Sequence, residues 1–261
     1  MRRPERVLFH TDPPSTRQTA AHPPPQGTRR VSRTPPSGGR NKKGDRDTEP
    51  PRATHGTLGT VDRLPDEYVH RLRLLEPAYL QHHDPIRQSG FSGGPERWRA
   101  ERSPILQAIT GDGDLIDVGC ANGYLLECLV GWAADIGITL TPHGLDIGPR
   151  LVDLARARLP AHAANLHVGN AWDWSPPRRY RFVYMLYDCV PLSHLGRMVG
   201  RLLDEYAEPG GRVILGAYGS HSDAAPPFDI ARFLREEGFE VAGTASGGDP
   251  VVTAFAWLGG R

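Results

Sequence analysis

The sequence is poor in cysteine, with three among 261 residues, and it contains no apolar run long enough to cross a bilayer. An odd number of cysteines inside apolar segments argues against a disulfide framework and predicts a reduced, cytoplasmic protein. The apolar core of a secretory signal peptide is also missing. We therefore expect neither export nor contact with a membrane.

Residues 1–55 have almost none of the periodic apolar residues that a folded domain needs. They contain ten prolines and 12 Lys+Arg against 5 Asp+Glu. A basic segment of this kind can neutralise nucleic-acid phosphates. Because its basic residues are dispersed among prolines, we favour a disordered, solvated tail, or translated sequence upstream of the true start.

Residues 61–109 show a helical pattern that predicts an amphipathic cap, which Pro77 and Pro85 should interrupt. The apolar positions on one side are Tyr68, Val69, Leu72, Leu75, Tyr79 and Leu80. His82 and His83 invite a metal site, but sequential histidines point apart on a helix and no third ligand follows at a suitable spacing. No metal is expected, and these histidines remain candidates only for lining an acceptor pocket.

The stretch 115–126 lacks two well-known nucleotide-binding signatures while keeping their strand, turn and helix order. A dinucleotide fold needs a third glycine where Tyr124 stands, and a P-loop needs a lysine that the turn does not contain. What remains is an acid-x-Gly-x-small-x-Gly pattern, made by Asp117, Gly119, Ala121 and Gly123. Small residues let the backbone approach a ligand closely, and the carboxylate suits an ammonium group rather than a pyrophosphate.

At these residues the chain resembles the class I S-adenosylmethionine-dependent methyltransferases, whose first motif has this acid-and-glycine form. Ala121 stands where the family more usually has a glycine. The resemblance covers about residues 95–258 and implies S-adenosyl-L-methionine, which has an ammonium, a carboxylate, a ribose and an adenine but no phosphate. Residues 110–261 would form the methyltransferase domain and residues 61–109 its helical lid.

A second short strand ends at Asp146, where a carboxylate can accept both hydroxyl hydrogens of a ribose. An acid could also cap a helix there, but Pro149 already supplies a helix start. After the third strand the family usually has Gly-Asp-Ala, with the acid on the adenine amino group. Here Asn170 stands in the acid position, and its amide oxygen can still accept that hydrogen bond. Trp172 would either cover the adenine face or pack against the helix below.

The resemblance therefore implies a set of cofactor-binding residues along the ends of the first four strands. They are Asp117, Gly119, Cys120, Ala121, Gly123, Asp146, Ile147, Asn170, Ala171 and Tyr187. No feature near Cys120 would lower the pKa of its thiol, so no nucleophilic role is assigned to it.

The segment after the fourth strand borders the transferable methyl group in the family. Methyl transfer from a sulfonium is a displacement, so a general base is needed only if the acceptor begins protonated. Asp188 or His194 could supply it, while Asp188 could equally orient the methionine end or cap the next helix. Tyr218 and His221 follow the fifth strand and are expected in the acceptor pocket.

The segment 95–102 is expected to lie over the methionine end of the cofactor. On the resemblance, Arg97, Trp98 or Arg99 could reach the carboxylate or exclude water. The alternative is that Trp98 packs this helix against the sheet while the arginines are solvated.

The whole pattern predicts an α/β fold: a doubly wound, mostly parallel, seven-stranded Rossmann-like sheet with a C-terminal antiparallel hairpin, preceded by the helical cap and the disordered tail. Helices are expected at 150–159, 195–206 and 229–237, the last one capped by Gly238. Strands are expected at 115–118, 142–146, 165–168, 180–186, 212–216, 239–245 and 251–258.

The leading hypothesis is an enzyme that transfers a methyl group by direct displacement to an unidentified acceptor, for which we favour a small molecule. An RNA methyltransferase tethered by the basic tail is a second possibility. The sequence Tyr187-Asp188-Cys189-Val190 lacks the Asn/Asp-Pro-Pro-aromatic motif of base-amino methylation and argues against that chemistry. A silent nucleotide-binding regulator is a third, opposed by the intact Asp117 and Asp146.

Overall fold

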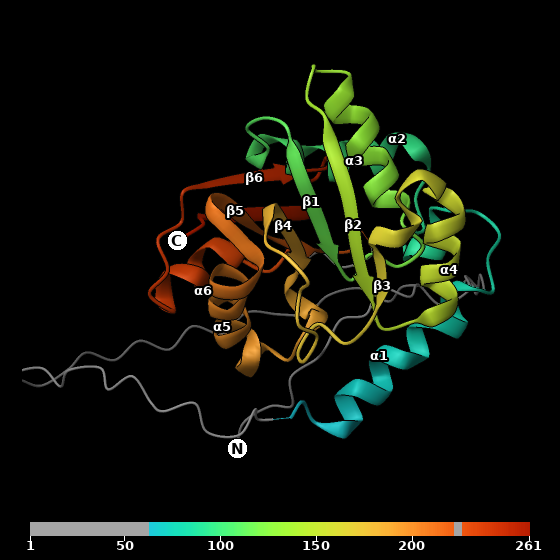
Figure 1. The fold of residues 1–261 in the computed structure, drawn as a ribbon, viewed down its shortest axis with the longest axis horizontal. Helices are drawn as coiled ribbons and strands as arrows, with labels where there is room; N and C mark the ends of the chain where they lie inside the picture. The colour runs from blue at the N-terminus through green and yellow to red at the C-terminus, as the bar shows by residue number, and fades with distance from the viewer. Residues whose placement is uncertain (1–62, 222–225) are drawn as a thin grey trace, which may run out of the picture. The chain divides into compact units, whose positions relative to one another are not determined.

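The computed structural model describes residues 63–221 and 226–261, drawn in colour in Figure 1. The predicted disordered tail, residues 1–55, lies outside the described residues. Four helical segments come first: α1 (Asp66–Tyr79), the short 3-10 helix η1 (Arg87–Ser89), α2 (Pro95–Arg102) and the 3-10 helix η2 (Ser103–Ala108). They lead directly into the first strand.

One seven-stranded sheet follows, with strand order β3-β2-β1-β4-β5-β7-β6. The parallel strands are β1 (Gly113–Val118), β2 (Leu140–Asp146), β3 (Leu166–Val168), β4 (Tyr180–Leu186) and β5 (Ala207–Tyr218). The strand β7 (Thr253–Gly259) runs antiparallel to β5 and to β6 (Gly243–Gly247). The predicted fold class, with its C-terminal antiparallel hairpin, is confirmed.

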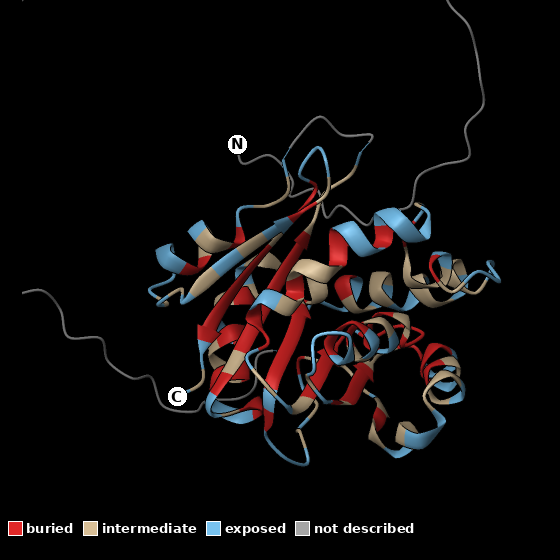
Figure 2. Ribbon diagram, turned by 90° about the horizontal axis from the view of Figure 1, so that it is seen from above, coloured by how far each residue is buried: buried red, intermediate tan, exposed pale blue. Residues whose placement is uncertain are grey.

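Helices cover both faces of this sheet because β1 and β4 are apolar on both sides, as buried parallel strands require. On one face, Leu115 and Phe182 pack with residues of α2, α3 (Tyr124–Ala134) and α4 (Pro149–Arg158). On the other, Ile116 and Val183 pack with α5 (Leu192–Arg201), the π-helix η5 (Leu202–Tyr206) and α6 (Ile230–Glu236). Figure 2 shows the central strands mostly in the buried colour and many exposed residues on the outer sides of the helices. The predicted stripe over 195–206 is therefore core.

Three predicted boundaries differ from the structure. Pro77 does not break α1, because it lies in the last turn, and the amide N of Leu80 still donates to the carbonyl of Glu76 at 3.0 Å. The Pro-Gly-Gly turn at 209–211 lies within β5 at a register shift, where Gly210 has a φ of 73°. The sixth strand begins at residue 243, because the amide N of Phe239 closes the end of α6 on the carbonyl of Leu234 at 2.9 Å.

The carboxyl ends of β1, β2 and β4 lie side by side, and this arrangement positions the site. Asp117 is in register with Gly144 on β2 and Tyr184 on β4. Helix α1 lies beyond these strand ends in Figure 1. In an open α/β sheet this edge is where ligands bind. No helix in the described parts of the chain has the length and apolar character that a membrane span requires.

Candidate functional site

A cavity opens at the carboxyl ends of the strands, beneath α1 and α2. It is lined by residues at or after the ends of β1 to β5, and by a roof of residues from the two helices and the 89–92 segment. Residues from the strand ends that line it are Gly119, Ala121, Leu145, Asp146, Ile147, Gly169, Asn170, Ala171, Leu186, Asp188 and Cys189. Six of the ten predicted cofactor-binding residues are therefore brought to one wall.

The turn after β1 owes its shape to positive φ angles. Gly119, Ala121 and Gly123 have φ values of 96°, 46° and 72°. Gly119 and Ala121 line the cavity, whereas Gly123 does not. A Cβ on Gly123 would lie 2.9 Å from the Cβ of Ala155 on α4. The third small residue of the motif thus allows α3 to pack against α4, which is a different role from ligand approach.

Asp146 is fixed by the backbone on both of its carboxylate oxygens. Oδ2 accepts from the amide N of Ala121 at 2.8 Å, and Oδ1 accepts from the amide N of Gly148 at 2.8 Å. Burial raises the pKa of this carboxyl, and the two hydrogen bonds oppose the rise. Each oxygen keeps a further lone pair, and the group lines the cavity.

Asp117 lies behind the turn and is not among the residues that line the cavity. It is 3% exposed. Burial, followed by the charge of Asp146, raises the pKa of Asp117 to about 8. At neutral pH this carboxyl is therefore mostly protonated in the free protein, and a cationic neighbour would favour its ionisation.

Asn170 and Ala171 line the cavity beside Asp146. The Oδ1 atom of Asn170 accepts from the amide N of Trp172 at 3.0 Å, so its position is set by its own turn. Trp172 is buried away from the cavity, with its ring 5.2 Å from that of His194. Of the two predicted roles for Trp172, packing is the one that its position supports.

The segment after β4 forms the 3-10 helix η4 (Tyr187–Cys189) and brings Asp188 to the cavity. Burial raises the pKa of Asp188 to about 6. Tyr187 turns away and stacks on Phe228, with the ring centroids 4.7 Å apart. His194 is not a lining residue; its Nδ1 is 3.0 Å from the Oγ of Ser193. Of the two predicted general bases, only Asp188 is therefore at the cavity.

The surroundings of the two cysteines near the site disfavour the thiolate form. Cys120 is buried outside the lining, and Cys189 lines the cavity with its Sγ 3.5 Å from the carbonyl of Val118. Burial, with smaller contributions from nearby carboxylates, raises the pKa of both thiols well above their ordinary value. This agrees with the expectation that Cys120 has no nucleophilic role.

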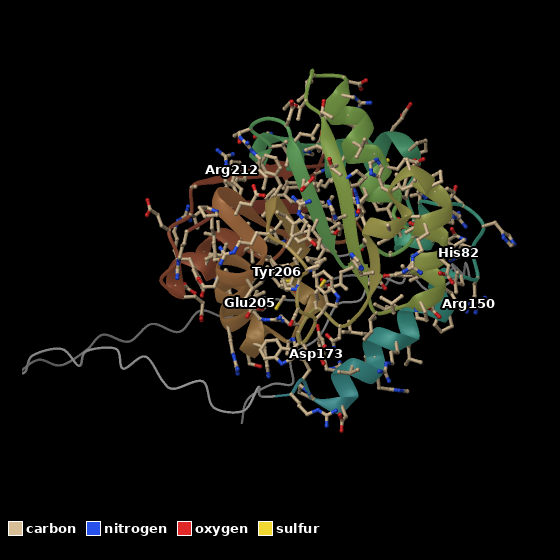
Figure 3. All side chains as sticks on the ribbon, viewed as in Figure 1. His82, Arg150, Asp173, Glu205, Tyr206 and Arg212 are labelled. Carbon is tan, nitrogen blue, oxygen red and sulfur yellow. The ribbon has the colours of Figure 1, made fainter. Side chains whose placement is uncertain are left out.

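Two contacts fasten α1 over the cavity. The hydroxyl of Tyr68 donates to the carbonyl of Asp188. Glu76 Oε2 accepts from the amide N of Arg150 at 3.0 Å, in the first turn of α4, which Figure 3 shows next to α1. Tyr79 from the last turn of α1 lines the cavity. The exposed His82 and His83 lie outside the lining.

The three residues predicted on helix α2 lie in three different surroundings. Arg97 lines the cavity. Trp98 is 3% exposed and packs edge-on against Phe91, and its Nε1 lies 3.3 Å from the Sγ of Cys128. Arg99 is on the surface, 3.5 Å from Asp135. Among the three, Arg97 is the one that can face a ligand.

Sequence reasoning missed Glu101 and Arg102, two buried charges that also line the cavity. Arg102 NH1 lies 3.2 Å from Glu101 Oε2, and its guanidinium lies 3.6 Å from the centroid of the Tyr218 ring. The spacing of Arg97 and Glu101, four residues apart on a helix, was the available signal. Tyr218 and His221 also line the cavity, and their place in an acceptor pocket stays a prediction.

Comparison with known proteins gives a fold but no close relative. No protein-family model matches the sequence, and no match to a curated protein was found. Solved structures do match. A 1,6-didemethyltoxoflavin-N1-methyltransferase from Burkholderia thailandensis has a TM-score of 0.54 and 12% identity, over 78% of this chain and 93% of that one.

Two further solved structures have a similar fold. The methyltransferase complexed with the Haloferax volcanii Trm112 activator has a TM-score of 0.53 and 15% identity, over 73% of this chain and 97% of that one. The magnesium protoporphyrin IX methyltransferase from Synechocystis, solved with bound S-adenosylmethionine, has a TM-score of 0.51 and 15% identity, over 77% and 100%. This chain has the class I methyltransferase fold.

Within that fold, the cavity lies at the strand ends that the ligand-binding rule for α/β sheets designates. Its lining includes two carboxyl groups, Asp146 at the end of β2 and Asp188 in η4. It also includes a charged cluster on α2, in which Glu101 contacts Arg97 and Arg102. In the described part of the chain, no group of three or more His, Cys, Asp or Glu residues is placed to hold a metal ion.

Proposed function

We propose that the protein binds S-adenosyl-L-methionine in this cavity and transfers its methyl group to a small-molecule acceptor. Three carboxyl groups in and behind the cavity wall support this proposal. Burial raises the pKa of Asp146, Asp117 and Asp188 together. A ligand with positive charge would relieve that cost, whereas a phosphate would increase it.

The chain's own residues fit the parts of this cofactor. Asp146 would accept from the two ribose hydroxyls, because its backbone hydrogen bonds hold both oxygens in place. Asn170 and Ala171 would face the adenine, and the backbone of Gly119 and Ala121 would contact the methionine portion. Arg97 would face the carboxylate. Asp117 would act from behind the turn through its charge, rather than by contact.

S-adenosylmethionine supplies an electrophilic methyl group on a positively charged sulfur. The protein's contribution is then to hold the acceptor in line with that methyl group. Such alignment can supply on the order of 7–11 kcal/mol of the barrier. The roof made by α1, α2 and the 89–92 segment would exclude water from the reacting groups.

A small acceptor is supported by the construction of this roof. Leu72, Leu75 and Tyr79 from α1 and Phe91 from the 89–92 segment line the cavity, so part of its wall is apolar. A nucleic acid would need an open, basic approach. Two of the structural neighbours have small-molecule names, didemethyltoxoflavin and magnesium protoporphyrin IX.

Calorimetric titration tests this proposal. We expect S-adenosylmethionine and S-adenosylhomocysteine to bind with 1:1 stoichiometry, and we expect ATP and NAD, which have ribose and adenine but also phosphates, to bind far more weakly. Equal binding of all four compounds would contradict the role given to the carboxyl groups. Absence of binding by the two sulfur compounds would refute the proposed function.

A further inference from the structure

Asn122 lies in the turn after β1 and connects this turn to the roof of the cavity. It is 0% exposed. Its Nδ2 atom donates to the carbonyl of Pro85 at 2.9 Å, and Gln88 Oε1 lies 3.3 Å from the same nitrogen. Pro85 and Gln88 precede Asn122 by 37 and 34 positions. One side-chain amide therefore joins the turn after β1 to the segment that follows α1.

The acceptor groups of Asn122 bind the helices beneath the roof. Its Oδ1 atom accepts from the amide N of Tyr124 at 3.2 Å, at the first residue of α3. Its backbone carbonyl accepts from the Nε atom of Arg158 on α4 at 3.1 Å. A buried donor left without a partner costs about 1–3 kcal/mol. The side chain is thus fixed from below, and its amide group stays directed at the roof.

The residue before Asn122 belongs to the ligand side of the same turn. Ala121 lines the cavity, and its amide N donates to Asp146 Oδ2 at 2.8 Å. Its φ of 46° is a conformation that residues with a Cβ rarely adopt, so contacts must hold it there. A ligand bound against Ala121 and Asp146 would stabilise the turn geometry from which Asn122 reaches the roof.

The segment that this amide holds is a compact hydrogen-bonded unit. Asp84 Oδ1 accepts from the amide N of Ile86 at 2.8 Å, and the carbonyl of Asp84 accepts from the amide N of Gln88 at 2.9 Å. The amide N of Phe91 donates to the carbonyl of Ile86 at 3.3 Å. Phe91 lines the cavity, and its ring centroid lies 5.4 Å from that of Trp98 on α2. The segment therefore extends from the buried amide to the cavity wall and α2.

We propose that Asn122 is a positioning residue that couples cofactor binding to closure of the roof segment 85–92. This inference rests on the proposed function and adds to it a route from the occupied turn to the roof. The cofactor holds the turn, the turn holds the Asn122 amide against Pro85, and the segment then covers the cavity. A coupling between two sites is reciprocal, so the closed roof also favours the turn geometry that binds the cofactor.

A purely structural role for Asn122 makes a different prediction. If the residue only stabilised the fold, its loss would loosen the roof segment by the same factor with and without a bound cofactor. The coupling role predicts that this factor depends on the cofactor. The quantity to measure is therefore the factor by which S-adenosylhomocysteine slows local opening of the segment.

Hydrogen exchange followed by NMR on the full chain, with and without saturating S-adenosylhomocysteine, measures this factor. The reporting amides are those of Ile86 and Gln88, which are bonded to Asp84 and do not line the cavity, so a bound ligand cannot protect them by contact. We expect the ligand to slow their exchange about 5- to 150-fold. The amide of Phe239, at the end of α6, reports general stabilisation and should slow by less than about twofold.

Asn122→Ser removes the Nδ2 donor, while the shorter hydroxyl can still accept from the amide N of Tyr124. In this variant the ligand-dependent protection of Ile86 and Gln88 should fall to that of Phe239. Calorimetry should also show weaker binding of S-adenosylhomocysteine, by up to the factor of protection that is lost, because the coupling is reciprocal.

Asn165→Ser is the matched control. The Nδ2 atom of Asn165 also donates to a proline carbonyl, that of Pro142, at 3.2 Å, and Asn165 does not line the cavity. This variant should keep both the protection and the affinity. Gln88→Ala serves if Asn122→Ser does not fold, because Gln88 is only half-buried and makes the longer contact with Asn122. It should lower the protection of Ile86 in the same direction by a smaller factor.

The outcomes are distinct. The inference is wrong, while the proposed function stands, if S-adenosylhomocysteine binds but leaves the exchange of Ile86 and Gln88 unchanged. It is also wrong if Asn122→Ser, or Gln88→Ala in its place, keeps the full ligand-dependent protection, or if Asn165→Ser loses that protection as well. If S-adenosylhomocysteine does not bind the wild-type chain, the proposed function itself fails.

Discussion

The carboxyl groups in and behind the cavity wall differ in their charged partners. Asp117, Asp146 and Asp188 have raised pKa values, and in the described residues no basic side chain forms an ion pair with them. Glu101 on α2 is instead paired with Arg97, Arg102 and His221. A cationic ligand would favour the ionised form of the first three carboxyl groups, whereas Glu101 already has two guanidinium partners.

The largest effect is expected at Asp146. Asp146→Ala should weaken both S-adenosylmethionine and S-adenosylhomocysteine by about 2–3 kcal/mol, because hydrogen bonds to a charged group are lost at the ribose. This corresponds to roughly 30- to 150-fold in Kd. Calorimetry on folded protein measures it. Unchanged affinity would remove the ribose assignment. It would also remove the contrast between Asp146, which has no basic partner, and Glu101, which has two guanidinium partners.

Gly123→Ala should lower the free energy of unfolding without changing a residue that lines the cavity. The added Cβ meets Ala155 at 2.9 Å, and the φ of 72° is unfavourable for alanine. We expect a loss of about 2 kcal/mol in the free energy of unfolding, measured in urea. Gly131→Ala on the same helix, where a Cβ meets nothing within 4 Å, should instead stabilise by about 0.5–1 kcal/mol. Equal stability in the two variants would contradict the packing role of Gly123.

Asp117 should make the ligand-free protein less stable as pH rises. Its folded pKa of about 8 is above its unfolded value, so between roughly pH 4 and 8 the folded state binds more protons and the free energy of unfolding falls as pH increases. Compared with Asp117→Asn, wild type should lose about 1.4 kcal/mol between pH 6 and 7. Urea denaturation at each pH measures this. Parallel curves for the two proteins would mean that Asp117 is ionised throughout.

The smallest effect is expected at Ala121, whose φ of 46° is strained for any residue with a Cβ. Ala121→Gly should stabilise the protein by about 0.5–1 kcal/mol, after allowing for the backbone entropy of glycine. Ala100→Gly, on an exposed helical position, should destabilise by a similar amount. If Ala121→Gly is also destabilising, the strain is not relieved by removing the side chain.

Much of the fold could be predicted because the periodicity of apolar residues and the residue types at turns can be read from short stretches of the sequence. The strand at 180–186, the core stripe of α5 and the cap at Gly238 follow directly from such patterns. The strand predicted at 239–245 was placed too early, because the amide N of Phe239 closes the end of α6 on the carbonyl of Leu234 and the strand begins only at Gly243.

The residues of the site differ in the same way: those in local motifs could be predicted, and those set by contacts between distant elements could not. Asp146 and Asn170 follow strands at motif spacing, so sequence could place them at the cavity. His194 could not be excluded, since only the packing of α5 shows that its ring faces Trp172. The contact of Glu101 with His221 could not be found, because the two residues are 120 positions apart and no local pattern links them; the spacing of Arg97 and Glu101 gave only the helical pair. Motif residues are visible in sequence, and contacts between distant elements are not.

A crystal structure of the complex with S-adenosylhomocysteine would show directly whether Asp146 and its neighbours hold the cofactor. We expect the ribose hydroxyls within hydrogen-bond distance of both oxygens of Asp146, the adenine beside Asn170, and the amino-acid carboxylate toward Arg97. A ligand in the reverse orientation, or one bound outside the wall formed by Ala121 and Asp146, would contradict it.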